Sequence, residues 1–140
     1  MKIELFFGQY RFLSNFFPCI VRMEGIDYPT LEHAYQAAKT LDEEERRKIA
    51  LAAAPKEAKR LGSSLALRPD WDDIRLCIME ELLCRKFAPG SDLAGGLIAT
   101  HPAELIEGNF WNDTYWGVCR GRGENHLGRL LMKIRASLMA

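Results

Sequence analysis

The segment from Tyr28 to Lys39, Tyr-Pro-Thr-Leu-Glu-His-Ala-Tyr-Gln-Ala-Ala-Lys, constrains the local backbone more tightly than any other part of the chain. A proline forces the residue before it into an extended conformation, and Pro29 does this to Tyr28. Threonine is favoured immediately before the first residue of a helix, because its hydroxyl accepts a free backbone N–H. Thr30 therefore predicts a helix that begins at Leu31 and continues to Lys39.

One face of this predicted helix is polar. Glu32, Gln36 and Lys39 follow a spacing of four and three residues, which apolar side chains usually occupy. At about 1.5 Å of rise per residue, Glu32 and Lys39 lie roughly 10 Å apart along the axis, which suits a sugar better than an ion pair. The alternative is that the helix dipole alone favours an acid in the first turn and a base in the last. The stripe is a candidate active site.

The size and charge of the chain narrow its functional class. With 140 residues and 48% hydrophobic side chains, the sequence predicts one domain around a single core. The formal net charge is zero, so any contact with a polyanion such as nucleic acid must be local. We find no signal sequence and no apolar run of membrane-spanning length, and we expect a cytoplasmic protein without membrane contact.

The four cysteines do not form a metal-binding pattern. They show no Cys-x-x-Cys spacing, and only three histidines accompany them, so we expect neither a metal nor a cofactor. Cys77 and Cys84 lie two turns apart on a predicted helix, where we expect buried thiols that act as small hydrophobic side chains.

Helices dominate the expected fold. Besides the segment after Thr30, we expect helices at residues 42–53, 55–62, 70–87, 92–100 and 125–138. Short strands are expected at residues 3–7, 19–23, 26–28, 105–108 and 115–118. Gly62 is expected to end its helix in a left-handed conformation. The sequence thus predicts a compact, helix-rich α+β domain over residues 1–140, with a few short β-strands.

A second candidate region extends from Glu107 to Gly117 and crowds tryptophans, acids and asparagines together without any regular period. Trp111 and Trp116 have flat rings that can stack on a base, while Asn109 and Asp113 can hydrogen-bond to its edge or to ribose hydroxyls. The alternative is that both tryptophans are core anchors beside a simple turn.

Two further segments carry weaker signals. Ser14 and Asn15 interrupt the apolar string from Phe12 to Phe17, either as a turn or as polar groups facing a ligand. Arg120 and Arg122 flank Gly121 just before the last predicted helix, where a phosphate can dock. The alternative for this second segment is a flexible connector.

Eight motifs follow one another in order: Phe12-Leu-Ser-Asn-Phe-Phe-Pro18, residues 28–39, Ala58-Lys-Arg-Leu-Gly62, Asp70-Trp71, Leu105-Ile-Glu-Gly-Asn-Phe-Trp111, Asp113, Tyr115-Trp-Gly117 and Asn125-His-Leu-Gly-Arg-Leu-Leu-Met132. Together they resemble the YbiA-like N-glycosidase family, also called the NADAR (NAD and ADP-ribose) superfamily. The resemblance covers nearly the whole chain. One departure is Asn112, where a glycine is expected.

The resemblance implies an enzyme that cleaves the bond between a base-like nitrogen and ribose C1′. Two substrate classes are associated with the family: phosphorylated ribosylamino-pyrimidines of riboflavin synthesis, and ADP-ribose attached to guanine in nucleic acid. A third alternative is a non-catalytic module that binds ADP-ribose. The sequence does not determine the oligomeric state.

Our mechanistic hypothesis places proton transfer on Glu32 and contact with the ribose on Lys39. A carboxylate stabilises the positive charge that develops on the sugar and orients water, whereas an uncharged lysine can form a Schiff base instead. Glu107 is the second candidate for the acid, and His33 is expected to be structural. The residues assigned to the substrate are Ser14, Asn15, Gln36, Trp71, Glu107, Asn109, Trp111, Asp113 and Trp116, with Arg120 and Arg122 as phosphate contacts.

Overall fold

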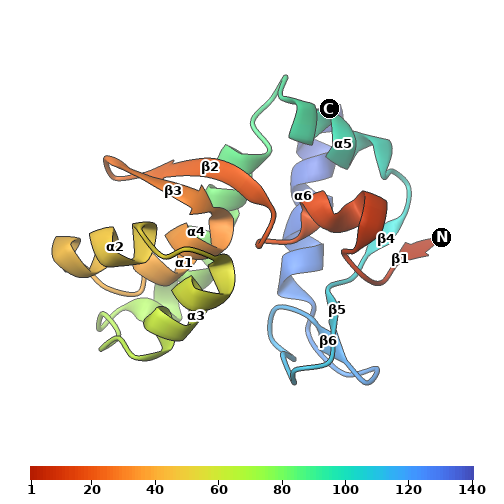
Figure 1. The fold of residues 1–140 in the computed structure, drawn as a ribbon. Helices are drawn as coiled ribbons and strands as arrows, with labels where there is room; N and C mark the ends of the chain where they lie inside the picture. The colour runs from red at the N-terminus through yellow and green to blue at the C-terminus, as the bar shows by residue number, and fades with distance from the viewer. The chain divides into compact units, whose positions relative to one another are not determined.

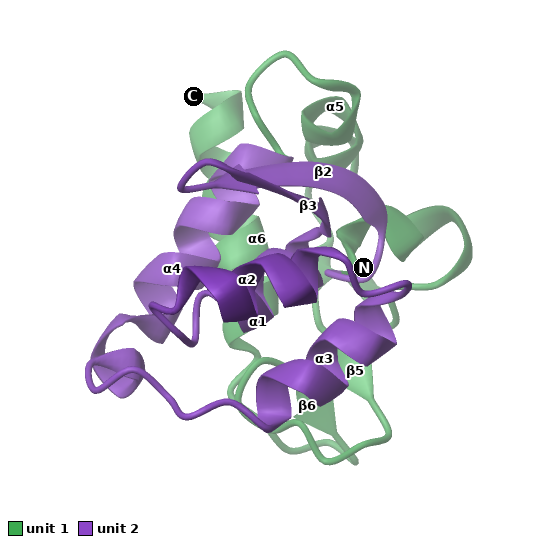
Figure 2. Ribbon diagram, turned by 60° about the vertical axis from the view of Figure 1, so that its left-hand side comes forward, with its two compact units in different colours: residues 1–14, 87–140 green, residues 15–86 purple.

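The computed structural model describes all 140 residues, which form two compact units (Figure 2). One unit comprises residues 15–86, and the other combines residues 1–14 with residues 87–140. Six α-helices, one 3-10 helix and six short strands make up the chain (Figure 1). The expected helix-rich α+β class is therefore confirmed, while a single domain over 1–140 stays a prediction.

The unit of residues 15–86 is a β-hairpin followed by four helices. Its elements are β2 (Pro18–Met23), β3 (Ile26–Thr30), α1 (Leu31–Ala37), α2 (Glu43–Ala50), α3 (Pro55–Ser63) and α4 (Trp71–Lys86). The strands are antiparallel, and both turn residues between them, Glu24 and Gly25, have the positive φ that tight hairpins require. α1 packs against both strands and all three other helices, and all seven of its residues are buried.

The predicted helix starts in this unit are confirmed. The Thr30 side chain accepts the backbone N–H of His33, and α1 begins at Leu31. The Asp42 side chain accepts the N–H groups of Glu44 and Glu45 ahead of α2. Pro55 is the first residue of α3, where its missing N–H costs no hydrogen bond.

Two expectations for this unit are wrong in detail. α1 ends at Ala37, so Lys39 lies in the turn beyond the helix. Gly62 lies inside α3 and has no positive φ. The glycine is there for space instead, because an added Cβ would overlap the side-chain oxygen of Gln36.

The expected burial of Cys77 and Cys84 is also wrong, since both are exposed. α4 packs against α1 and β2, and the side chains it buries there include Met79, Leu82 and Leu83. At 100° per residue, both cysteines project away from Met79. The partners of the helix, rather than its apolar composition, determine which thiols meet water.

The unit of residues 1–14 and 87–140 combines very short strands with two helices. Its elements are β1 (Lys2–Ile3), η1 (Gly8–Leu13), α5 (Asp92–Ala99), β4 (Glu104–Leu105), β5 (Gly108–Asn109), β6 (Val118–Cys119) and α6 (His126–Met139). β1 pairs with β4 and β5 pairs with β6, both in parallel. α5 packs against α6.

Two strand predictions in this unit are too long. The opening strand stops at Ile3, and the positive φ of Gly8 turns the chain into η1. The strand expected at residues 115–118 is reduced to Val118–Cys119, because the N–H groups of Tyr115 and Trp116 bond to the Asp113 carboxylate instead of a neighbouring strand. None of the helices in either unit has the length and apolar composition needed to cross a membrane.

Candidate active site

Glu32 and Gln36 form a buried pair on α1. The Gln36 Nε2 donates a hydrogen bond of 2.6 Å to Glu32 Oε2, and the two residues are only 8% and 3% exposed. The backbone N–H of Glu32 donates to the carbonyl of Asn15 at 3.1 Å. The Gln36 amide thus orients the buried carboxylate of Glu32, and a proton-transfer group must be positioned in this way.

Lys39 is half-buried in the turn that follows α1, where its backbone N–H donates to the carbonyl of Gln36 at 3.2 Å. Burial lowers the pKa of Lys39 below its ordinary value, against the opposing charge of Glu32, and the charge of Lys59 on α3 lowers it further. A lower pKa increases the fraction of uncharged amine, which is the form that can act as a nucleophile. A Schiff-base role demands a lysine whose pKa is lowered, and burial and the nearby charge of Lys59 both act in that direction.

Tyr35 and Trp71 supply aromatic surface beside Lys39. Their ring centroids lie 5.3 Å apart at an interplanar angle of 54°, and both residues are buried. The Lys39 Nζ lies 5.8 Å from the centroid of the Tyr35 ring, within the range of a cation–π contact. Trp71, expected to contact substrate, thus packs first against a tyrosine of α1.

Two buried amide oxygens in this unit have no hydrogen-bond donor: Asn15 Oδ1 and Gln36 Oε1. The Asn15 Nδ2 donates to the sulfur of Met79 at 3.6 Å, which leaves the oxygen as its unused polar atom. Both residues also bond to Glu32, one through its backbone carbonyl and the other through its side chain. Buried polar oxygens almost always accept a hydrogen bond, so these two are exceptions. Because both residues bond to Glu32, the surroundings of this acid are polar.

His33, next to Glu32 in the sequence, has a structural role, as expected. Its Nε2 lies 3.1 Å from the carbonyl of Ala52, which can only accept, so Nε2 carries the proton. Its Nδ1 lies 2.8 Å from the Thr30 hydroxyl and accepts that hydrogen. Both ring nitrogens therefore connect α1 to its own cap and to the segment after α2.

In the other unit, Asn109 organises the loop that follows β5. Its Nδ2 donates to the carbonyls of Asp113 and Val118 at 2.8 and 3.3 Å, and its Oδ1 accepts the N–H groups of Trp111 and Asp113. The Asp113 carboxylate in turn accepts two further backbone N–H groups, those of Tyr115 and Trp116. The side chains of Asn109 and Asp113, which were expected to contact the substrate, thus hold the backbone of the loop in its conformation.

The two tryptophans of this loop differ in exposure. Trp111 is 52% exposed and follows Phe110, which is 73% exposed. Trp116 packs edge-on against Tyr115 at 4.8 Å between ring centroids and lies 6.4 Å from the ring of His126. Trp111 therefore offers open ring surface for stacking, whereas Trp116 belongs to a local aromatic cluster.

Asn112, at the position where the resemblance led us to expect glycine, adopts a φ of 67°. Asparagine is among the few residues other than glycine that enter this left-handed region readily, so it fits the turn found here. The Asn112 Oδ1 also accepts a hydrogen bond from Arg120 at 3.1 Å. Arg120 and Arg122 are both exposed, and their role in phosphate binding stays a prediction.

Asn125 has a role that its position before α6 did not reveal. Its side chain does not cap the helix: Oδ1 accepts the N–H of Glu107 and Nδ2 donates to the carbonyl of Leu105, both at 2.9 Å. Asn125 thereby holds the backbone of Glu107, the second acid candidate, in place. Ser14 follows η1 in the same unit.

Neither unit brings together three or more His, Cys, Asp or Glu side chains in the manner of a metal site. The residues that sequence reasoning missed are Lys59, Gly62, Arg68 and Asn125. Only Gly62 and Asn125 stood out in the sequence, as a small residue within a helix and as an expected cap.

The NADAR domain family matches residues 5–139. The N-glycosidase YbiA of Escherichia coli (strain K12) is 39% identical over 132 residues, which cover 92% of this chain and 82% of that protein. A riboflavin biosynthesis protein of Vibrio vulnificus is 38% identical over 91% of this chain but only 35% of its own length. The NMR structure of the E. coli protein YbiA superimposes with a TM-score of 0.84, covering 99% of this chain and 87% of that one, at 37% identity.

The chain belongs to the NADAR domain family. Its similarity to N-glycosidases over most of both chains makes it an enzyme of that class, a hydrolase acting on N-glycosyl bonds.

Proposed function

We propose that this enzyme hydrolyses phosphorylated ribosylamino-pyrimidines, the early intermediates of riboflavin synthesis, at the bond between nitrogen and ribose C1′. The observation that carries the proposal is the buried Glu32–Gln36 pair, followed one turn later by a half-buried lysine of lowered pKa. The riboflavin biosynthesis proteins among the relatives support this substrate class.

In the water-attack route, the bond between C1′ and nitrogen breaks and its electron pair leaves with the nitrogen, which takes up a proton. A water oxygen bonds to C1′, and Glu32 takes the proton that this water loses. The carboxylate also stabilises the positive charge that builds up on the sugar. The amide nitrogen of Gln36, which donates to Glu32 Oε2, holds this carboxylate in place.

In the Schiff-base route, the sugar ring opens and the Lys39 amine adds to C1′. The substrate nitrogen leaves as the free amine, and water then hydrolyses the lysine imine to release the sugar. The lowered pKa of Lys39 supports this route. Borohydride reduction during turnover distinguishes the two routes, because only an imine is trapped as a stable adduct at Lys39.

Mass-spectrometric product analysis tests the function. The purified protein receives the ribosylamino-pyrimidine phosphate and, in parallel, guanine-ADP-ribosylated DNA. We expect ribose 5-phosphate from the first substrate, a loss of that product in Glu32→Gln, and unchanged turnover in Glu43→Gln, a surface acid on α2.

The same experiment covers the alternatives. Release of ADP-ribose alone would identify a hydrolase of ADP-ribosylated guanine, for which the exposed ring of Trp111 offers a stacking surface. Turnover of neither substrate, with ADP-ribose still bound, would identify a binding module. If Glu107→Gln abolishes turnover while Glu32→Gln retains it, the proton carrier is Glu107.

A further inference from the structure

The turn that carries Lys39 is held by residues distant in sequence. The last carbonyls of a helix find no hydrogen-bond donor within the helix. The carbonyls of Lys39 and Thr40 follow just after the end of α1, and their donors come from elsewhere in the chain. The backbone N–H of Arg68 donates to the Lys39 carbonyl at 2.8 Å. The Arg46 side chain donates from Nε to the Thr40 carbonyl, also at 2.8 Å.

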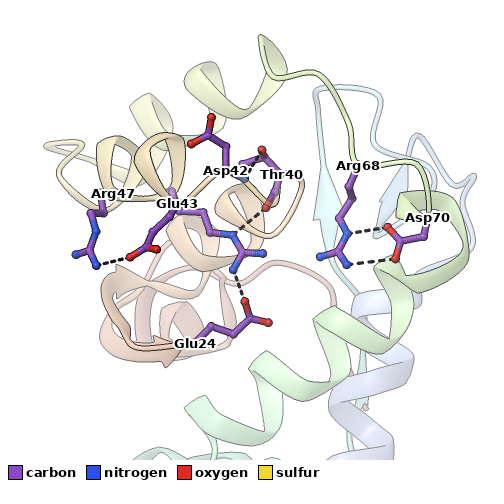
Figure 3. Close-up of polar contacts among 8 residues, drawn as sticks. Glu24, Thr40, Asp42, Glu43, Arg47, Arg68 and Asp70 are labelled. Atoms are coloured by element: carbon purple, nitrogen blue, oxygen red, sulfur yellow. Dashed lines mark hydrogen bonds and ion pairs between the residues drawn. The ribbon is translucent and has the colours of Figure 1, made fainter.

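The side chain of Arg68 is itself fastened. Its Nε and Nη2 donate to the two carboxylate oxygens of Asp70 at 2.7 and 3.2 Å, as Figure 3 shows. This two-point arrangement holds the planar guanidinium in one orientation. The Arg68 side chain is 16% exposed, far less than Arg22 of the hairpin at 62% or Arg47 of α2 at 61%.

Arg68, Trp71 and Tyr35 form a ring of contacts that begins and ends at Lys39. Its carbonyl accepts the N–H of Trp71 at 3.1 Å, its N–H binds the carbonyl of Lys39, and Trp71 packs on Tyr35. The ring of Tyr35 in turn contacts the Lys39 Nζ. Ion pairs at the surface contribute little to stability, so a pair kept in this place points to a local role.

We propose that Arg68, fastened by Asp70, is a positioning residue that holds Lys39 and Trp71 in register at the candidate active site. The inference rests on the proposed function of Lys39 for its effect on turnover. The effect of Arg68 on the titration of Lys39 does not depend on that function and can be measured without substrate.

The charged groups around Lys39 come from several elements. Glu32 lies on α1, which precedes the turn of Lys39, and Lys59 lies on α3. Arg46 of α2, paired with Glu24, holds the adjacent carbonyl of Thr40. Shortening Arg68 removes its two side-chain bonds to Asp70 and leaves all of these groups in place, so we expect the segment of residues 64–70, which carries the backbone bond to Lys39, to loosen. Water then reaches Lys39 more easily, which relieves the burial that lowers its pKa.

The test follows the titration of Lys39 by NMR of ¹³C-labelled lysine side chains, with the Lys39 signal assigned from its loss in Lys39→Arg. In Arg68→Ala we expect the pKa of Lys39 to rise toward its ordinary value, because burial no longer lowers it as far. Arg68→Lys should restore part of the shift. Arg22→Ala, which removes an exposed ion pair of the hairpin, should leave the titration unchanged.

Turnover gives the second readout. In Arg68→Ala the acid limb of the kcat profile should move to higher pH, with kcat near neutrality falling roughly tenfold and KM changing less.

An unchanged Lys39 titration in folded Arg68→Ala would overturn the proposal. If Arg68→Ala does not fold, Asp70→Asn decides, with a smaller rise supporting the proposal and no rise overturning it. Full turnover by Lys39→Ala would contradict the role of Lys39 but leave the NMR result valid.

Discussion

The backbone of Gly62 on α3 packs directly against the side-chain amide of Gln36 on α1, so closely that a Cβ at position 62 would overlap Oε1. The other end of the same amide donates to Glu32. The missing side chain of Gly62 is therefore what admits the group that orients the candidate acid.

Replacing Gly62 tests this relationship. In Gly62→Ala the added methyl displaces the Gln36 amide from Glu32, so we expect a loss of about 1–3 kcal/mol of unfolding free energy from overpacking, together with lower kcat. Urea unfolding and steady-state kinetics measure the two effects. The matched control is Gly95→Ala in α5, where a Cβ meets nothing within 4 Å, and which should stabilise by about 0.5–1 kcal/mol. A Gly62→Ala protein as stable and active as the parent would show that the amide has room to move.

The cap of α1 gives a second prediction. Thr30→Ala removes the acceptor for the His33 N–H and the hydroxyl bound by the His33 ring, so the free energy of unfolding should fall by about 1 kcal/mol. Thr30→Ser keeps the hydroxyl and should restore most of this loss. Denaturant unfolding of the three proteins provides the measurement. Equal stability of the alanine and serine variants would mean that the hydroxyl contributes nothing.

The loop of residues 109–118 should depend on one side chain. Asn109→Ala leaves backbone N–H and carbonyl groups of the loop without partners, and we expect a loss of about 1–3 kcal/mol with faster amide hydrogen exchange from Trp111 to Val118. Asn112→Gly in the same loop keeps the positive φ of the turn and should change stability by less than about 0.5 kcal/mol. Similar exchange rates in both variants would contradict the assigned role of Asn109.

The Arg68–Asp70 pair should contribute to stability only above a certain pH. The hydrogen bond from Arg68 holds the pKa of Asp70 below its ordinary value of 3.8 in the folded protein. A carboxyl whose pKa is lower in the folded state stabilises the protein at any pH above 3.8, and this contribution is lost as the pH falls through the folded-state pKa. Asp70→Asn should therefore be less stable than the parent at neutral pH, and the two should converge in acid. A difference that does not shrink with acid would exclude the ion pair as its source.

The amino-acid sequence by itself determined where helices begin. The starts at Leu31, Glu43 and Pro55 follow from Thr30, Asp42 and the proline ring, because a cap acts on backbone groups only two or three residues away. The polar stripe of Glu32 and Gln36 was equally visible, since the helical period places both residues on one face.

Tertiary structure alone decided how those residues are used. Lys59 and Arg68 lie 20 or more residues beyond Lys39, and nothing in the local sequence shows that they surround it. The exposure of Cys77 and the space at Gly62 likewise depend on which helices pack together. Capping is a short-range interaction along the chain, whereas burial, close approach and the pKa of a side chain are set by whatever the folded chain brings alongside it.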